Sequence, residues 1–197
     1  MKIAIAGSHG LIGTNLVTHF RKSNINVTRI VRLKDQNGIY WDPLTGYINH
    51  ENLENYDAII NLCGEKIASF NPFFKNKNKL ISSRVSTNLI LSKTIAKLVN
   101  PPKYFITASA TGIYKPTKRR ITESGKLNTG FLAQLALEWE EASKFYDNGK
   151  TKIINLRLGQ VISPKSFYFK ALSNITKYMK ISSCLLYTSD AADDDVR

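Results

Sequence analysis

Three glycines follow the first short apolar run of the chain, and their spacing is the first feature that indicates chemistry. Gly7, Gly10 and Gly13 stand in the segment AGSHGLIG, directly after the apolar residues 3–6. Between a strand and a helix, glycines at this spacing allow a tight turn, let a diphosphate approach the backbone and let the helix pack closely. The amides at the helix N-terminus then face the anion. The segment therefore predicts a dinucleotide-binding loop, with a purely structural turn as the alternative.

Arg32 stands where the preference for one dinucleotide over another is usually set, at the expected end of the second strand. NAD-binding units commonly place an acidic residue there, about 20 residues beyond the glycines, to hold the ribose 2′-hydroxyl. Here the strand end reads RIVRLK, with Lys34 close to Arg32 and Asp35 further along. A guanidinium in place of a carboxylate favours a 2′-phosphate. The residue therefore predicts NADP(H) as the cofactor, and a solvated surface arginine is the alternative.

Strand and helix patterns alternate along the chain, and this order positions the glycines between the first strand and the first helix. Five near-continuous apolar runs are typical of strands covered on both faces: 3–6, 27–31, 58–62, 104–108 and 153–158. Three stretches show helical spacing of apolar residues: 11–22, 79–99 and 131–147. We expect a further helix at 167–178 and, at 38–51, an irregular piece with a turn between two short extended parts. The alternation predicts an α/β fold with a parallel sheet and right-handed crossovers.

Length and composition restrict the class of protein. With 197 residues, 43% hydrophobic and 22% charged, the chain has the composition of one ordinary globular domain. It contains neither a long apolar span nor a signal-peptide pattern, so we expect a cytoplasmic protein without membrane association. The two cysteines, Cys63 and Cys184, have no neighbours at metal-ligand spacing, and no metal site is expected.

The net charge of +13 is the other compositional signal. A strongly basic chain can indicate a polyanionic partner. A general richness in lysine, asparagine and isoleucine explains the charge equally well, and the sequence lacks a helix-turn-helix pattern, zinc-ligand spacing or a basic stripe interleaved with aromatic residues. We therefore expect a small-molecule substrate and no nucleic-acid partner, while the sequence does not indicate an oligomeric state.

Residues 184–197, CLLYTSDAADDDVR, differ in composition from the rest of the chain. They contain neither lysine nor asparagine, and four aspartates fall within 190–195. The string closely resembles the translation of a transposase-type sequencing adapter, so we expect the natural reading frame to end near Ser183; a natural acidic tail is the alternative. The expected organisation is a nucleotide-binding domain at 1–163, the start of a truncated C-terminal region at 164–183, and a non-native tail at 184–197.

The succession of motifs resembles a known family. Its segments, in order, are GSHGLIG, YWDPLTG, DAIINLCGEKI, SSRVSTN, TASATGIY, TES, GFLAQLALEWEEA and INLRLGQVIS. They resemble the atypical extended short-chain dehydrogenase/reductases of the nucleoside-diphosphate-sugar-epimerase-like family, over residues 1 to about 163. The resemblance implies a Rossmann-type parallel sheet with helices on both faces and an NADP(H) site. It also implies that the C-terminal substrate lobe of such proteins is missing from this chain.

The resemblance assigns further residues to the cofactor. Leu11 and Ile12 match the positions whose helix-start amides complete the pyrophosphate loop with the three glycines. Leu62, Cys63 and Gly64 match the family's loop after the strand that passes under the adenosine half. Cys63 stands where alanine is common, and we interpret it as a small packing residue rather than a nucleophile.

The resemblance also shows that the usual catalytic pair is absent. Ordinary members of the wider short-chain dehydrogenase/reductase superfamily use a tyrosine and a lysine four residues apart, and the tyrosine exchanges a proton with the substrate oxygen. The atypical family itself lacks this pair and often has cysteine at the lysine position, which this chain lacks too. In this chain Leu132 and Ala136 occupy the two positions, and neither side chain can transfer a proton.

Three other residues are candidates for the chemistry. Ser109 matches the serine at the end of the strand before the active site and is expected to hydrogen-bond a substrate carbonyl or hydroxyl, or to cap the backbone. Arg84 matches the family's arginine and is expected to hold an anionic substrate group or to pair with a helix neighbour. Tyr114 is the candidate for a substitute acid near Ser109, although Lys115 follows it where the family has glycine. Trp139 and Glu140 match a structural pair, with Glu140 expected to pair locally.

Two functions follow from these residues. The first is an NADP(H)-dependent oxidoreductase or epimerase-like enzyme of unknown substrate, supported by Ser109 beside a complete cofactor loop. The second is a non-catalytic NADP(H)-binding sensor or scaffold, supported by the loss of both usual catalytic side chains. Binding of NADPH without turnover would favour the second.

Overall fold

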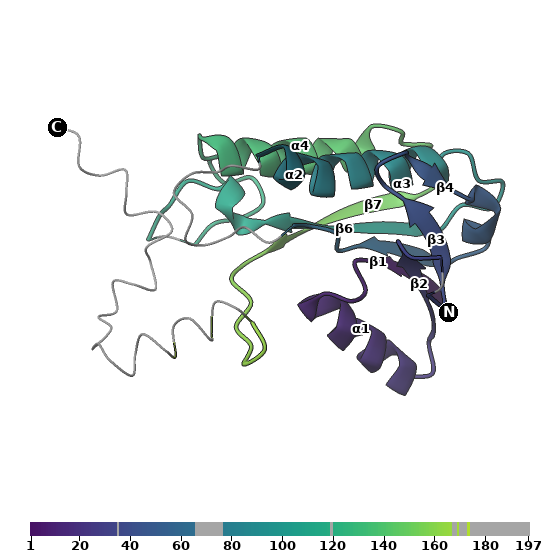
Figure 1. The fold of residues 1–197 in the computed structure, drawn as a ribbon. Helices are drawn as coiled ribbons and strands as arrows, with labels where there is room; N and C mark the ends of the chain where they lie inside the picture. Colours follow the sequence, from purple (N-terminus) through teal and green to yellow (C-terminus); the bar gives the residue numbers. More distant parts are fainter. Residues whose placement is uncertain (35, 66–76, 119, 167–168, 170–172, 174–197) are drawn as a thin grey trace.

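A seven-stranded sheet forms the centre of the computed structural model, which describes residues 1–34, 36–65, 77–118, 120–166, 169 and 173 (Figure 1). The strand order is β4-β3-β2-β1-β5-β6-β7. The strands are β1 (Lys2–Ala6), β2 (Asn26–Val31), β3 (Ile39–Asp42), β4 (Tyr47–Ile48), β5 (Ala58–Asn61), β6 (Tyr104–Ala110) and β7 (Lys152–Leu158). All neighbours pair in parallel except β4, which pairs antiparallel with β3 at one edge.

Helices lie on both faces of this sheet, which confirms the expected α/β, Rossmann-type architecture. Helix α1 (Leu11–Lys22) covers one face, and α2 (Lys77–Ile81), α3 (Thr87–Ile95) and α4 (Phe131–Lys144) lie on the other (Figure 1). A π-helical turn, η2 (Ser82–Ser86), joins α2 to α3, and short 3₁₀ turns occur at η1 (His50–Leu53) and η3 (Thr111–Ile113). Within the described part of the chain, no helix has the length and apolar character needed to cross a membrane.

Two apolar cores hold the layers together. Strand β1 is buried from Ile3 to Ala6, because a parallel strand at the centre of such a sheet is covered on both faces. Toward α1, Ile3 and Ile5 pack with Val17 of that helix. On the opposite face, Ala4 and Ala6 belong to the cluster that includes Leu91 of α3. The alternation of side chains along β1 thus divides the two cores.

The structure confirms the turn between two extended parts predicted at 38–51 and departs from the prediction at 79–99. Residues 38–51 form the two short extended parts, β3 and β4, with the predicted turn at 43–46 between them. The sequence did not indicate that β3 joins the central sheet beside β2, where its Trp41 is only 1% exposed because it packs into the core. The helix expected at 79–99 begins at Lys77, is interrupted by the π turn and ends at Ile95. Most of the helix expected at 167–178, and all of 184–197, lie outside the described residues.

The order of the strands creates the place where a ligand can bind. The chain leaves β1 toward β2 and β3 on one side, and it resumes on the other side at β5, β6 and β7. At such a reversal the connections after neighbouring strands diverge, which opens a crevice at the carboxyl ends of the strands. The loops after β1, β2 and β5 therefore lie close together at the carboxyl ends of these central strands.

Candidate functional site

The loop after β1 is packed too closely for side chains at two of its glycines. Gly7 has a φ of +72°, and a Cβ there would lie 2.6 Å from the carbonyl carbon of Leu62, in the loop after β5. A Cβ at Gly13 would lie 2.4 Å from the carbonyl oxygen of Gly7. The Gly10 amide donates a hydrogen bond to that same oxygen at 3.1 Å, which closes the turn. Both close approaches require glycine, so the spacing observed in the sequence has a steric cause.

The start of α1 offers unpaired amides at this turn. Gly10 is the N-cap of the helix, without a side-chain cap, and its carbonyl accepts the first intrahelical hydrogen bond. Consequently the amides of Leu11, Ile12 and Gly13 have no hydrogen-bond partner among the described residues. Three N–H groups at the positive end of a helix dipole suit phosphate oxygens. The predicted cofactor residues of the loop thus have the arrangement that a pyrophosphate needs.

Arg29, which no sequence motif indicates, supports this loop from β2. Its Nη1 donates a hydrogen bond to the Ser8 carbonyl oxygen at 2.6 Å. Burial lowers the pKa of Arg29, and the nearby charge of Arg21 lowers it further. The Ser8 hydroxyl is buried and has no hydrogen-bond partner among the described residues. A buried hydroxyl without a partner is rare in folded proteins, and a phosphate bound at this loop is the kind of group that would satisfy it.

Arg32 directly follows β2 and is exposed. Burial raises the pKa of the Cys63 thiol to about 12, and the positive charge of Arg32 opposes that rise, which places Arg32 near the loop after β5. Lys34 lies elsewhere, with its Nζ 5.3 Å from the centroid of the Tyr40 ring. The raised pKa keeps the thiol protonated at neutral pH, which agrees with a packing role for Cys63. Selection of a 2′-phosphate by Arg32 stays a prediction.

A network of buried amides ties the loop after β5 to the helices above it. The Oδ1 of Asn61 accepts a hydrogen bond from the Cys63 amide at 3.0 Å. Its Nδ2 donates to Asn88 Oδ1 at 2.7 Å and to Thr87 Oγ1 at 3.2 Å. Asn88 in turn donates to the Trp139 carbonyl oxygen at 2.9 Å. The backbone that packs against Gly7 is therefore fixed by α3 and α4.

The π-helical turn places Arg84 inside the protein, with 8% of its surface exposed. Its Nη2 donates to the Glu65 carbonyl oxygen at 2.9 Å, and its Nη1 donates to the Leu80 carbonyl oxygen at 3.4 Å. The guanidinium also lies 5.2 Å from the centroid of the Trp139 ring, and a Cβ at Gly64 would lie 3.3 Å from it. Burial lowers the pKa of Arg84, and Glu65 opposes this. This geometry favours local pairing over a role in holding an anionic substrate group.

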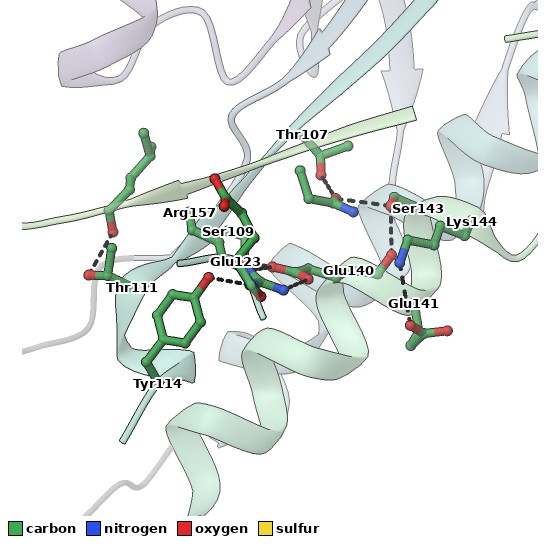
Figure 2. A network of polar contacts seen from close by, with 12 residues as sticks. Thr107, Ser109, Thr111, Tyr114, Glu123, Glu140, Glu141, Ser143, Lys144 and Arg157 are labelled. Atoms are coloured by element: carbon green, nitrogen blue, oxygen red, sulfur yellow. Dashed lines mark hydrogen bonds and ion pairs between the residues drawn. The ribbon is translucent and has the colours of Figure 1, made fainter. Parts of the chain in front are cut away.

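Ser109 and Tyr114 are connected by an ion pair that no sequence motif indicates (Figure 2). Both carboxylate oxygens of Glu140, on α4, accept hydrogen bonds from Arg157, on β7, at 2.8 Å. The Ser109 hydroxyl donates to Glu140 Oε1 at 2.6 Å. The Nη1 of Arg157 donates to the Tyr114 hydroxyl and, at 3.0 Å, to the Glu123 carbonyl oxygen. Residues from α4, β6, β7 and the loop after β6 therefore form one chain of hydrogen bonds.

The ion pair at the centre of this network is held in its charged form. The Glu140 side chain is 7% exposed and that of Arg157 is 23% exposed. Burial by itself would raise the pKa of Glu140, but hydrogen bonds from Arg157 and Ser109 lower it below its ordinary value. The hydrogen bonds from Arg157 to Glu140 likewise raise the pKa of the guanidinium, against the effect of burial. At neutral pH Glu140 therefore only accepts hydrogen bonds, and Arg157 only donates them.

The prediction that Glu140 pairs locally is wrong. Its partners Ser109 and Arg157 lie on β6 and β7, far from it along the chain. Helix α4 carries at helical spacing the two positions of the usual tyrosine and lysine, here Leu132 and Ala136, and then Glu140. Glu140 therefore lies one turn after the usual lysine position. The signal in the sequence was Arg157 itself, because a charged residue within an apolar strand requires a partner.

The lowered pKa of Glu140 predicts how stability depends on pH. Because that pKa is lower in the folded state, the contribution of Glu140 is complete above its ordinary pKa of about 4.3 and is lost as the pH falls through the folded value. We expect the free energy of unfolding to fall more steeply below about pH 4.3 in the wild type than in Glu140→Gln. Urea denaturation at a series of pH values measures this difference. Equal slopes in the two proteins would contradict it.

Comparison with known proteins identifies relatives along most of the chain. The model of the NAD dependent epimerase/dehydratase family matches residues 3–191. The epimerase family protein Mb2239 of Mycobacterium bovis is 37% identical over 165 residues, which cover 82% of this chain and 54% of that protein. The human epimerase family protein SDR39U1 is 28% identical over 168 residues, covering 82% and 55%. The chain thus spans about half the length of the curated relatives it matches.

Solved structures show the same fold. The nucleoside-diphosphate sugar epimerase from Corynebacterium glutamicum superimposes with a TM-score of 0.79 and 25% identity, covering 93% of this chain and 39% of that one. Human SDR39U1 isoform 2, solved with NADPH, gives a TM-score of 0.74 and 25% identity, covering 88% and 59%. On the match of the family model to most of its residues, the chain belongs to the NAD-dependent epimerase/dehydratase family.

Proposed function

We propose that this chain binds NADP(H) at the carboxyl ends of β1, β2 and β5, as part of an oxidoreductase or epimerase-like enzyme acting on a small molecule. One observation carries the proposal. The loop from Gly7 to Gly13 excludes side chains at both of these positions, and it leaves three helix-start amides and the Ser8 hydroxyl without partners among the described residues. The structure of the human relative with NADPH supports the choice of cofactor.

The parts of the site have distinct tasks in this proposal. The amides of Leu11, Ile12 and Gly13 would hold the pyrophosphate, and Arg32 would hold the 2′-phosphate. A bound NADP(H) would supply or accept the hydride. Arg84 does not touch the substrate in this assignment, because its guanidinium is engaged by the backbone near Gly64.

Ser109 and Tyr114 are the proposed catalytic residues. With Leu132 and Ala136 at the usual positions, α4 supplies no proton donor there, whereas the Tyr114 hydroxyl lies in the network that contains Ser109. A phenol placed to transfer a proton contributes about 10²–10⁴-fold to the rate. The Ser109 oxygen keeps a lone pair that can accept a hydrogen bond from a substrate hydroxyl.

The absence of the usual tyrosine and lysine supports a second function, an NADP(H)-binding sensor or scaffold without turnover. NADPH oxidation against a panel of small aldehydes, ketones and keto sugars separates the two. Oxidation above the rate without substrate supports the enzyme. Tight binding of NADPH with no oxidation across the panel supports the sensor.

Replacing Arg32 tests the cofactor and its selection in one experiment. We expect Arg32→Ala to weaken NADPH binding about 10–100-fold, the loss of one charge-assisted contact to the 2′-phosphate, and to leave NADH binding unchanged. Isothermal titration calorimetry with both nucleotides measures the two affinities. Lys34→Ala is the matched control, because Lys34 lies over the Tyr40 ring and should not change the ratio.

Two results would contradict this expectation in different ways. If wild-type protein gives no heat with NADPH, the proposed function fails. If Arg32→Ala binds NADPH as the wild type does, the cofactor site stands and its selection by Arg32 fails.

A further inference from the structure

The ion pair fixes the direction of the hydrogen bonds on either side of it. A guanidinium has donors and no acceptor, so the Tyr114 oxygen must accept from Arg157, and the phenolic proton is not used in that contact. An ionised carboxylate only accepts, so the Ser109 hydroxyl must donate to Glu140. The network therefore leaves a donor on Tyr114 and an acceptor on Ser109.

The backbone holds these groups in place. Ser109 and Arg157 are direct partners across β6 and β7, so the register of the sheet sets their separation. The Arg157 guanidinium also lies 4.9 Å from the centroid of the Tyr114 ring. Tyr114 itself is held by an antiparallel bridge to Leu127. Further hydrogen bonds between the same two backbone segments flank that bridge.

We infer that Glu140 and Arg157 are positioning residues for proton transfer by Tyr114: Glu140 holds the guanidinium through both oxygens, and Arg157 turns the phenol so that its O–H is donated out of the network. The inference rests on the proposed function and adds to it the cation that orients the tyrosine. It places that cation on β7, whereas ordinary members of the short-chain dehydrogenase/reductase superfamily carry theirs on the same helix as their tyrosine.

The proposed reaction moves a proton from Tyr114 to the substrate. The O–H bond of Tyr114 breaks, its proton forms a new O–H bond on the carbonyl oxygen of the substrate, and the electron pair stays on the phenol oxygen beside the Arg157 guanidinium. A bound NADPH would supply the hydride to the carbonyl carbon, and the two transfers together would reduce the carbonyl to an alcohol. Solvent then returns a proton to Tyr114. In the opposite direction the phenol oxygen takes the proton of an alcohol.

The first test measures the direction of the hydrogen bond at Tyr114 in the whole 197-residue chain. In ultraviolet resonance Raman spectra, the relative intensities of the tyrosine Fermi doublet differ between phenols that accept a hydrogen bond and phenols that only donate one. The difference between wild type and Tyr114→Phe isolates the signal of Tyr114. We expect an acceptor signature in wild type, its loss in Arg157→Met, and no change in Lys34→Met, which removes a cation from the Tyr40 ring instead.

The wild-type spectrum alone can overturn the inference, even where Arg157→Met does not fold. A donor-only signature at Tyr114 in wild type would do so. An acceptor signature that persists in folded Arg157→Met would do so as well, because the donor would then be another group.

The second test asks whether this orientation matters for proton transfer. With a carbonyl compound that the wild type reduces, Tyr114→Phe and Arg157→Met should each lower kcat about a hundredfold while the Kd for NADPH stays unchanged. Unchanged kcat in either folded variant overturns the inference. If NADPH binds but no compound of the panel is reduced, the enzymatic half of the proposed function fails and takes the proton transfer with it. If NADPH does not bind, the cofactor site fails, and the Raman result still decides the direction of the hydrogen bond.

Discussion

Replacing Arg157 by methionine is expected to lower the free energy of unfolding by about 3 kcal/mol or more, one of the two largest effects expected for a single substitution in this chain. The variant leaves the Glu140 carboxylate in a place where 7% of its side chain is exposed, and among the described residues the Ser109 hydroxyl is its one remaining hydrogen-bond donor. Removing one partner of a buried ion pair lowers the free energy of unfolding by more than the intact pair contributes to it, because the remaining charge stays desolvated. Protonation of Glu140 limits the cost, since burial then raises its pKa without opposition from Arg157.

The neighbouring residue on α4 supplies a matched control for that substitution. Glu141 pairs with Lys144 at 3.7 Å, and their side chains are 75% and 52% exposed. Breaking this pair with Lys144→Ala should change stability by no more than about 0.5 kcal/mol, because water replaces the lost contact. Urea denaturation followed by circular dichroism measures both variants under the same conditions.

A double variant separates the cost of an unpaired charge from the value of the pair. In Arg157→Met combined with Glu140→Leu, no charge remains buried, and we expect much of the lost stability to return. A single variant Arg157→Met that is as mild as Lys144→Ala would show that water reaches Glu140 freely. That result would contradict the conclusion that the ion pair between Glu140 and Arg157 is buried.

The elements that the sequence predicts well are those whose signals are local. Strand β1 and helix α1 were predicted to within one residue because an apolar run, three glycines and an amphipathic pattern follow one another directly. The two extended parts and the turn within 38–51 were predicted, but their place in the central sheet was not, because it depends on Ile39 and Trp41 pairing with β2 and packing into the core. The π turn around Arg84 has no local signal at all, since its extra residue serves a side chain that packs on Trp139 and Gly64.

The same distinction divides the candidate site. The glycine loop is a local feature. The Cβ position of Gly13 lies against the loop itself, and that of Gly7 lies against the loop after the neighbouring strand β5. The network of Glu140 and Arg157 depends on the register between β6 and β7 and on the helix that packs over them. No spacing within one segment of sequence encodes that register. Sequence reasoning therefore named Ser109 and Tyr114 but missed the pair that connects them.

Replacing Gly7 by alanine is expected to weaken NADPH binding about a hundredfold or more, equivalent to about 2.7 kcal/mol. The residue has a φ of +72°, and its new Cβ would lie 2.6 Å from the carbonyl carbon of Leu62. The atoms that this Cβ would meet belong to the backbone of the loop after β5 and cannot rotate away. The loop after β1 must therefore move away from the loop after β5, and the helix-start amides move with it. Calorimetry with NADPH measures the loss, and circular dichroism establishes that the variant is folded.

Two other glycines separate backbone strain from close approach. Gly46 has nearly the same φ, +74°, but no heavy atom lies within 4 Å of its Cβ position, so Gly46→Ala should cost about 1 kcal/mol of stability and leave NADPH binding unchanged. Gly13 has no positive φ, but its Cβ would meet the Gly7 carbonyl oxygen at 2.4 Å, so Gly13→Ala should impair binding as Gly7→Ala does. If all three variants bound NADPH equally well, the loop would not be the cofactor site. If Gly7→Ala alone lost binding, the conformation of Gly7 and its contact with Leu62, rather than the packing of the helix start at Gly13, would determine the shape of the loop.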